Sequence, residues 1–143
     1  MGDILASLAP VTQKFDTPIS ESNYSKGTVK AWSGKHQGLD IAMPFGSFVP
    51  SVTEGVLQSV EFSKKGWGLT AVIKAPDGAE VRYSHLLSID PRLKIGQQIE
   101  LGREIAQVGN TGNVFSAHGG DGTHLDLRIR KGGKYIDPYS YYI

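Results

Sequence analysis

The sequence of 143 residues contains no cysteine. This absence excludes disulfides, thiolate ligands for a metal ion and every mechanism that uses a cysteine nucleophile. An excess of charge of either sign is also lacking, because 15 basic and 14 acidic residues nearly cancel. Such a balance gives no reason to expect a nucleic-acid partner or an anionic membrane surface as a partner.

Long apolar runs are absent as well. No stretch approaches 18 consecutive apolar residues, so the sequence predicts no membrane span. The N-terminal stretch MGDILASLAPV carries an acid where a signal peptide carries positive charge, and its apolar part is short. We therefore identify no signal peptide in this chain, which has the length of one ordinary globular domain.

Helical periodicity is missing too, since no stretch of eleven or more residues keeps a 3.6-residue period. Eighteen glycines and seven prolines instead separate short β-type runs. Residues 55–62, 69–75 and 79–86 are typical of three strands in a meander, and residues 122–130 alternate cleanly. Glycines divide residues 95–109 into short apolar pieces that suit small strands in tight corners. The sequence predicts an all-β domain with little helix.

The last alternating run carries the first candidate site. Alternation places Leu125 and Leu127 on the apolar face of a strand and His124 with Asp126 on the other face. The β-carbons of His124 and Asp126 would lie roughly 6 to 7 Å apart, close enough for both side chains to reach one atom. Two alternatives remain open, a hydrogen-bonded pair on a wet sheet face and a salt bridge from Arg128 to Asp126.

Two further histidines stand in runs that can aim them at a common cleft. His36 and Asp40, in GKHQGLD, would lie about 13 Å apart on a straight strand, so the chain must bend at Gly38 before both can reach one cation. Histidine nitrogen and aspartate oxygen are ordinary zinc donors, although a pair with this spacing is most often a surface turn. In VRYSHLL, alternation groups His85 with Tyr83 on one face, and His85 can equally be a core-edge histidine.

Taken together and in order, these segments resemble the zinc endopeptidases of the lysostaphin and LytM type, the M23 metallopeptidases that cut peptide cross-links in bacterial cell walls. The similar segments are HQGLDIAMP, VPSVTEGVLQSVEF, YSHLLSI, IGQQIELGREIAQVGNTGN, THLDLRI and the closing DPYSYY. The resemblance implies a peptidase domain at residues 30–143, preceded by an extension at residues 1–29 that partly belongs to it. The implied fold is a mostly antiparallel β-sheet with a second small sheet forming a groove.

The resemblance also implies roles for five residues. His36, Asp40 and Asp126 would bind the metal ion, while His85 and His124 would act catalytically on the water and the developing oxyanion. Asp126 departs from the family, which has the second histidine of its His-x-His motif at this position. A second carboxylate makes the centre less positive and should acidify a bound water less. One zinc ion is the implied cofactor, with manganese or another divalent metal as alternatives.

A second departure is the loop NVFSAHGGDG, at residues 113–122, which is longer than the corresponding link of the family. Its glycines suggest mobility, and it can shape or cover a groove. His118 lies within this loop and is assigned no role. Trp32 and Trp67 are candidates for groove walls, with core packing as the alternative for each.

The predicted function is that of a metal-dependent endopeptidase, a hydrolase of peptide cross-links or stem peptides in bacterial peptidoglycan. It would act outside the cell at the cell wall, or on a phage virion as part of a tail or lysin. The alternative, motivated by Asp126, is a degenerate and inactive M23-like domain that serves as a cell-wall binding or activator module. A serine hydrolase is disfavoured because the Gly-x-Ser-x-Gly motif is absent, and a glycosidase pair cannot be located among 14 scattered acids. The sequence does not indicate an oligomeric state.

Overall fold

A computed structural model describes residues 11–13, 38–41, 43–64, 66–111 and 125–138. The elements ordered along these ranges are all strands. They are β1 (Val11–Gln13), β2 (Leu39–Ile41), β3 (Phe48–Pro50), β4 (Gly55–Ser63), β5 (Gly68–Lys74), β6 (Glu80–Ile89), β7 (Gln98–Ile99), β8 (Glu104–Val108), β9 (Leu125–Lys131) and β10 (Lys134–Ile136). The all-β prediction is confirmed. In the described part of the chain, no helix has the length and hydropathy needed to cross a membrane.

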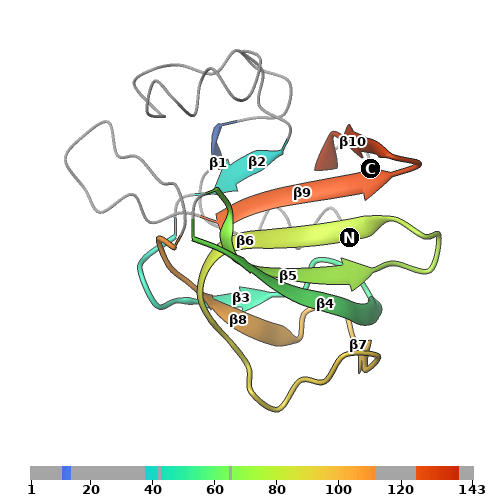
Figure 1. Cartoon of the computed structure of the whole chain (residues 1–143), viewed down its shortest axis with the longest axis horizontal. Coiled ribbons are helices and arrows are strands. Elements are labelled where there is room, and N and C mark those ends of the chain that lie inside the picture. Colours follow the sequence, from blue (N-terminus) through green and yellow to red (C-terminus); the bar gives the residue numbers. More distant parts are fainter. Residues whose placement is uncertain (1–10, 14–37, 42, 65, 112–124, 139–143) are drawn as a thin grey trace.

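The strands form one hydrogen-bonded sheet, in which every pair is antiparallel (Figure 1). Its main path runs β1-β2-β9-β6-β5-β4-β7, and β10 extends the sheet from β9. The predicted meander is present as β4, β5 and β6. Strand β8 pairs with both β3 and β6, so a small two-stranded arm is joined to the main sheet by hydrogen bonds.

One face of the central strands builds the core. In β9, Leu125, Leu127 and Ile129 are fully buried, as their alternation predicted. They join apolar side chains from the other strands in one cluster, which includes Leu39, Ile41, Val49, Leu57, Ala71, Ile73, Val81, Tyr83, Leu86, Ile99, Ile105 and Val108. Burial of this apolar face provides the main driving force for the fold and fixes which side chains must point the other way.

The opposite face of β2, β9 and β6 is polar, and two rows of side chains cross it. Asp40, Asp126 and Ser84 form the first row as Cα partners across the three strands. Arg128 and Arg82 form the second row as partners across β9 and β6. Directly opposed residues of antiparallel strands share a face, so the acidic row and the basic row lie next to each other.

Tyr83 links β6 to the segment that follows β3. Its ring is fully buried, and its hydroxyl oxygen accepts a hydrogen bond from the Val52 backbone N–H at 2.9 Å. The Ser51 hydroxyl lies 3.5 Å from the same oxygen. Burial raises the pKa of Tyr83 to about 12, because a phenolate cannot be solvated in the core. The phenol therefore supplies a neutral acceptor inside the core.

Replacing Tyr83 by phenylalanine tests this link. The Tyr83→Phe variant should lose about 1–3 kcal/mol of unfolding free energy, because the buried Val52 N–H loses its acceptor. The folded protein also holds the phenol proton more tightly than the unfolded chain, whose reference pKa is 10.0. This contribution to stability is full below about pH 10 and is lost as the pH rises toward 12. Urea unfolding across this range should show a smaller alkaline loss in the variant than in the parent; an equal loss would contradict the assignment.

Candidate functional site

Two of the predicted metal ligands lie opposite each other in the sheet. Asp40 of β2 and Asp126 of β9 are Cα partners on the polar face, and both are buried, with 5% and 2% of their surface exposed. The neighbours of Asp40, Leu39 and Ile41, are core residues. Alternation therefore turns the Asp40 side chain away from the core and toward Asp126. The register thus sets Asp40 and Asp126 directly opposite each other on the polar face.

Two further members of the predicted centre, His36 and His124, lie outside the described residues. In the sequence, His124 directly precedes the first residue of β9, and His36 precedes Asp40 by four residues. The described residues contain no group of three His, Cys, Asp or Glu side chains suited to a metal ion. The ligand set and the role of His124 therefore stay predictions.

Three other sequence predictions concern Trp32, His118 and the loop at residues 113–122. All of them lie outside the described residues. Trp67 is described and is half-buried, at the turn that leads into β5. Its ring lies near two arginines of the polar face, with the guanidinium carbon of Arg82 at 5.4 Å and that of Arg128 at 5.0 Å from the ring centroid. Trp67 thus packs on the face that carries Asp126.

A bidentate ion pair fixes the carboxylate of Asp126. Arg128 Nε donates to Oδ1 at 2.8 Å and Nη2 donates to Oδ2 at 3.0 Å. The two side chains are 1% and 2% exposed. The salt bridge that the sequence left open is confirmed. Two parallel charge-assisted hydrogen bonds set the orientation of the carboxylate and offset its charge.

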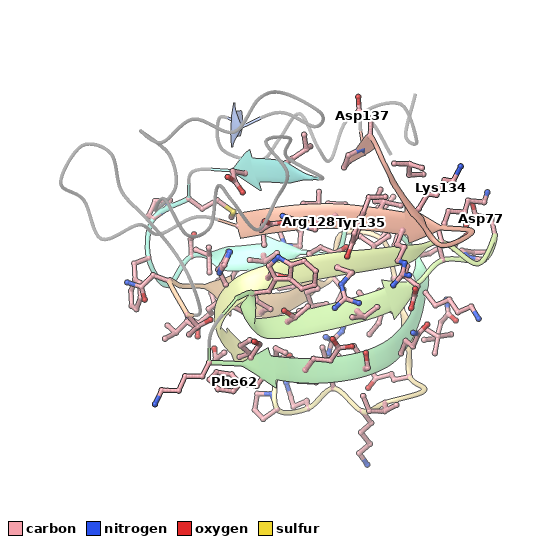
Figure 2. The ribbon with its side chains drawn as sticks, turned by 45° about the horizontal axis from the view of Figure 1, so that its top comes forward. Phe62, Asp77, Arg128, Lys134, Tyr135 and Asp137 are labelled. Atoms are coloured by element: carbon pink, nitrogen blue, oxygen red, sulfur yellow. The ribbon has the colours of Figure 1, made fainter. Side chains whose placement is uncertain are left out.

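Arg128 is itself enclosed by aromatic rings. Its guanidinium carbon lies 5.0 Å from the Trp67 ring centroid and 5.6 Å from that of Tyr135, and the two rings meet edge to face at 6.5 Å and 81°. Figure 2 shows Arg128 and Tyr135 beside each other near the middle of the sheet, next to β9. The predicted bend is present at Gly38. A β-carbon added to this glycine would lie 2.6 Å from Arg128 Cγ, so the absence of a side chain here leaves room for the arginine.

The third described site residue, His85, interrupts β6. It has a positive φ of 62°, a left-handed conformation that costs a non-glycine residue on the order of 1–3 kcal/mol. Tyr83 and Leu86 are both core residues, and opposite them the register of β5 shifts between Leu69 and Ala71. An extra residue at this bulge resets the alternation. The strand-period argument that grouped His85 with Tyr83 therefore fails here.

Hydrogen bonds from two separate segments hold His85. Its backbone N–H donates to the Trp67 carbonyl at 2.9 Å, and its carbonyl accepts from the Gly109 N–H at 3.0 Å. Its ring Nδ1 lies 2.7 Å from the Thr111 carbonyl oxygen. A carbonyl can only accept, so Nδ1 carries the proton, and Nε2 is the nitrogen that can exchange one. This is the tautomer that a histidine needs in order to transfer a proton through Nε2.

Sequence reasoning did not single out Thr111. Its hydroxyl donates to the Leu86 carbonyl at 2.7 Å and accepts from the Leu69 N–H at 3.1 Å. The sequence signal was slight, a threonine between asparagine and glycine in GNTG after an apolar run. Such a residue usually marks a turn, and its bonds to two distant strands become visible only in the fold.

The chain is similar in sequence to known peptidases and to a hydrolase activator. Residues 34–138 match the profile of Peptidase family M23. A stretch of 95 residues is 34% identical to the peptidoglycan DD-endopeptidase ShyA of Vibrio cholerae, covering 66% of this chain and 20% of ShyA. A stretch of 114 residues is 28% identical to the murein hydrolase activator NlpD of Escherichia coli, covering 80% of this chain and 28% of NlpD. The chain thus spans less than a third of either relative.

A solved structure agrees with this assignment. The structure of a zinc-containing peptidase from Vibrio cholerae superimposes with a TM-score of 0.68 and 26% identity, over 90% of this chain and 35% of the other. The resemblance seen in the ordered sequence motifs is confirmed. The family profile covers more than half of the chain, and the β2–β9 pairing joins two of the motifs that carry the resemblance. This chain belongs to Peptidase family M23.

Proposed function

We propose that this domain is a metal-dependent endopeptidase that hydrolyses peptide cross-links or stem peptides of bacterial peptidoglycan. The observation that carries the proposal is the in-register pair of buried carboxylates, Asp40 and Asp126, on the polar face. Buried carboxylates are rarely placed side by side unless a cation or another partner offsets their charge. A relative named as a peptidoglycan endopeptidase supports this substrate class. Such a substrate would locate its action at the cell wall, outside the cell or on a phage particle.

The donor set fits a divalent cation chemically. Two carboxylates and one histidine are acceptable ligands for zinc, and their oxygen-rich character also suits manganese. A carboxylate offers about four acceptor positions, and the fork of Arg128 uses two of those on Asp126. Ligating carboxylates are commonly held by such outer hydrogen bonds. The proposed ligands are His36, Asp40 and Asp126.

Arg128 offsets the less positive centre that Asp126 led us to expect from the sequence. An aspartate in place of a histidine adds one negative charge to the centre, which would weaken the activation of water. The guanidinium of Arg128, paired with that carboxylate, adds one positive charge. The pair as a whole is neutral, as a histidine ligand would be. The site therefore keeps the formal charge of a centre with two histidines and one carboxylate.

The chain's own residues would divide the remaining chemistry. A bound cation supplies polarisation of the scissile carbonyl and acidification of a water. His85, with its proton fixed on Nδ1, would accept a proton at Nε2 or, once protonated, donate a hydrogen bond from it. His124, two residues before the proposed ligand Asp126 in the sequence, would take the other of these two tasks. Hydrogen bonds to the oxygen that gains charge lower the barrier most.

A second candidate function is supported by the same ion pair. The Asp126 carboxylate has a bidentate partner in Arg128, which offsets its charge. A site of this kind suits a binding or activating module, and one relative is named a murein hydrolase activator. Tight binding to purified peptidoglycan, or stimulation of a separate hydrolase, without metal content or cleavage would favour this candidate over the endopeptidase.

Metal removal and a histidine substitution test the proposed reaction. The protein loaded with zinc or manganese should release new amino termini from purified peptidoglycan, and chelation should abolish the release until metal is restored. His124→Ala should lower the rate at least about 100-fold with an unchanged circular dichroism spectrum, because a proton-transfer group is lost. His118→Ala is the matched control and should retain full activity. Protein that holds no metal and releases no amino termini would exclude the proposal.

The energetic role of the ion pair can be tested separately from activity. Arg128→Met should lower the unfolding free energy by about 3–5 kcal/mol, because it leaves a buried carboxylate without its guanidinium. The double variant Asp126→Leu/Arg128→Met should recover most of this loss. Arg82→Met is the matched control, because its pair with Glu61 is partly exposed and should contribute about 1 kcal/mol or less. If urea unfolding gave equal losses of free energy in the two arginine variants, the buried pair would contribute no more to stability than the partly exposed pair.

A further inference from the structure

His85 lies in a conformation that its surroundings must maintain. A left-handed φ at a non-glycine residue persists only where neighbouring contacts determine it. The contacts come from the turn before β5, through Trp67, and from the segment after β8, through Gly109 and Thr111. The position of the imidazole therefore depends on where these two segments stand relative to β6.

Thr111 joins the three parts of this arrangement. Its hydroxyl bonds to the backbone of Leu86 in β6 and of Leu69 in β5, while its carbonyl oxygen meets the His85 ring. The main chain of Thr111 packs directly on Gly68, where an added β-carbon would lie 2.4 Å from the Thr111 carbonyl carbon. Side chain, carbonyl and main-chain packing thus all fix the same residue against the two strands.

We infer that Thr111 is a positioning residue, whose hydroxyl anchors the carbonyl that keeps the His85 proton on Nδ1 and its Nε2 ready for proton transfer. The catalytic part of this inference rests on the proposed function, whereas the tautomer does not. Neutral histidine can carry its proton on either nitrogen, and the partner of one nitrogen decides which form is present. Without an anchored acceptor at Nδ1, part of the His85 population would carry its proton on Nε2. That form cannot accept a proton there.

Nitrogen NMR of the imidazole rings in the full chain tests the inference directly. A His85→Gln variant identifies the His85 signals among those of the four histidines. The parent protein and Thr111→Ser should show the Nδ1–H tautomer. Thr111→Val, which keeps the shape and loses the hydroxyl, should lower the share of that tautomer at least about 2-fold. Thr53→Val is the matched control, because the Thr53 hydroxyl donates locally, to the adjacent Glu54 carbonyl.

Gly68→Ala provides a second variant, because its β-carbon would lie 2.4 Å from the carbonyl carbon of Thr111 and 2.5 Å from both its carbonyl oxygen and its hydroxyl oxygen. The added β-carbon should displace the Thr111 carbonyl and lower the Nδ1–H share in the same way. In the cleavage assay, Thr111→Val should reduce kcat by the factor by which the Nδ1–H share falls, at least about 2-fold, with KM unchanged, and Thr111→Ser should restore kcat. A purely structural role would change stability, but it would not lower kcat at an unchanged KM, and serine would not restore kcat.

The outcomes separate the inference from the proposed function. A parent protein that lacks the Nδ1–H tautomer, or a folded Thr111→Val that keeps the parental tautomer, would overturn the positioning role even if peptidoglycan is cleaved. A tautomer shift in Thr111→Val, present in a protein that cleaves nothing, would support the positioning role and reject the endopeptidase. A shift of equal size in Thr53→Val would also overturn the inference, because the effect would then not be specific to Thr111.

Discussion

The register of β9 between β2 and β6 is the constraint on which the rest of the site depends. Because Leu125, Leu127 and Ile129 must face the core, Asp126 and Arg128 are forced onto the opposite face. The same register sets Asp40 against Asp126. A register shift of one residue would exchange the two faces and disrupt both the core and the site. The packing of the core therefore also positions the charged groups.

The fold and part of the site could be predicted from the sequence because they follow from local periodicity. Alternation in β9 and the glycine-bounded runs of β4 to β6 were sufficient for the all-β assignment. The ordered motifs predicted Asp40 and Asp126 as ligands of one metal ion, and the register of β2 and β9 sets these two residues opposite each other. Periodicity failed where the backbone departs from the regular strand, at His85, since a bulge leaves no clear mark in the residue pattern.

The contacts of Arg128 and Thr111 could not be predicted from local periodicity, but the cause is different. A salt bridge between Arg128 and Asp126 was one of several open possibilities, and its strength depends on burial beneath rings contributed by Trp67 and Tyr135. Thr111 meets strands that are distant along the chain. Contacts of this kind depend on the tertiary structure. A single sequence gives the residue types, but it does not show which distant residues meet.

The bulge at His85 divides β6 into two halves that are out of phase. Before it, Val81 and Tyr83 alternate into the core, and after it Leu86 does so in shifted order. If the strand kept all its residues but lost the bulge, strict alternation would carry Leu86 outward and turn its exposed neighbour Leu87 inward. The histidine thus lies at a change of register that burial of Leu86 requires in a strand of this length, so the core and the proposed chemistry depend on the same irregularity.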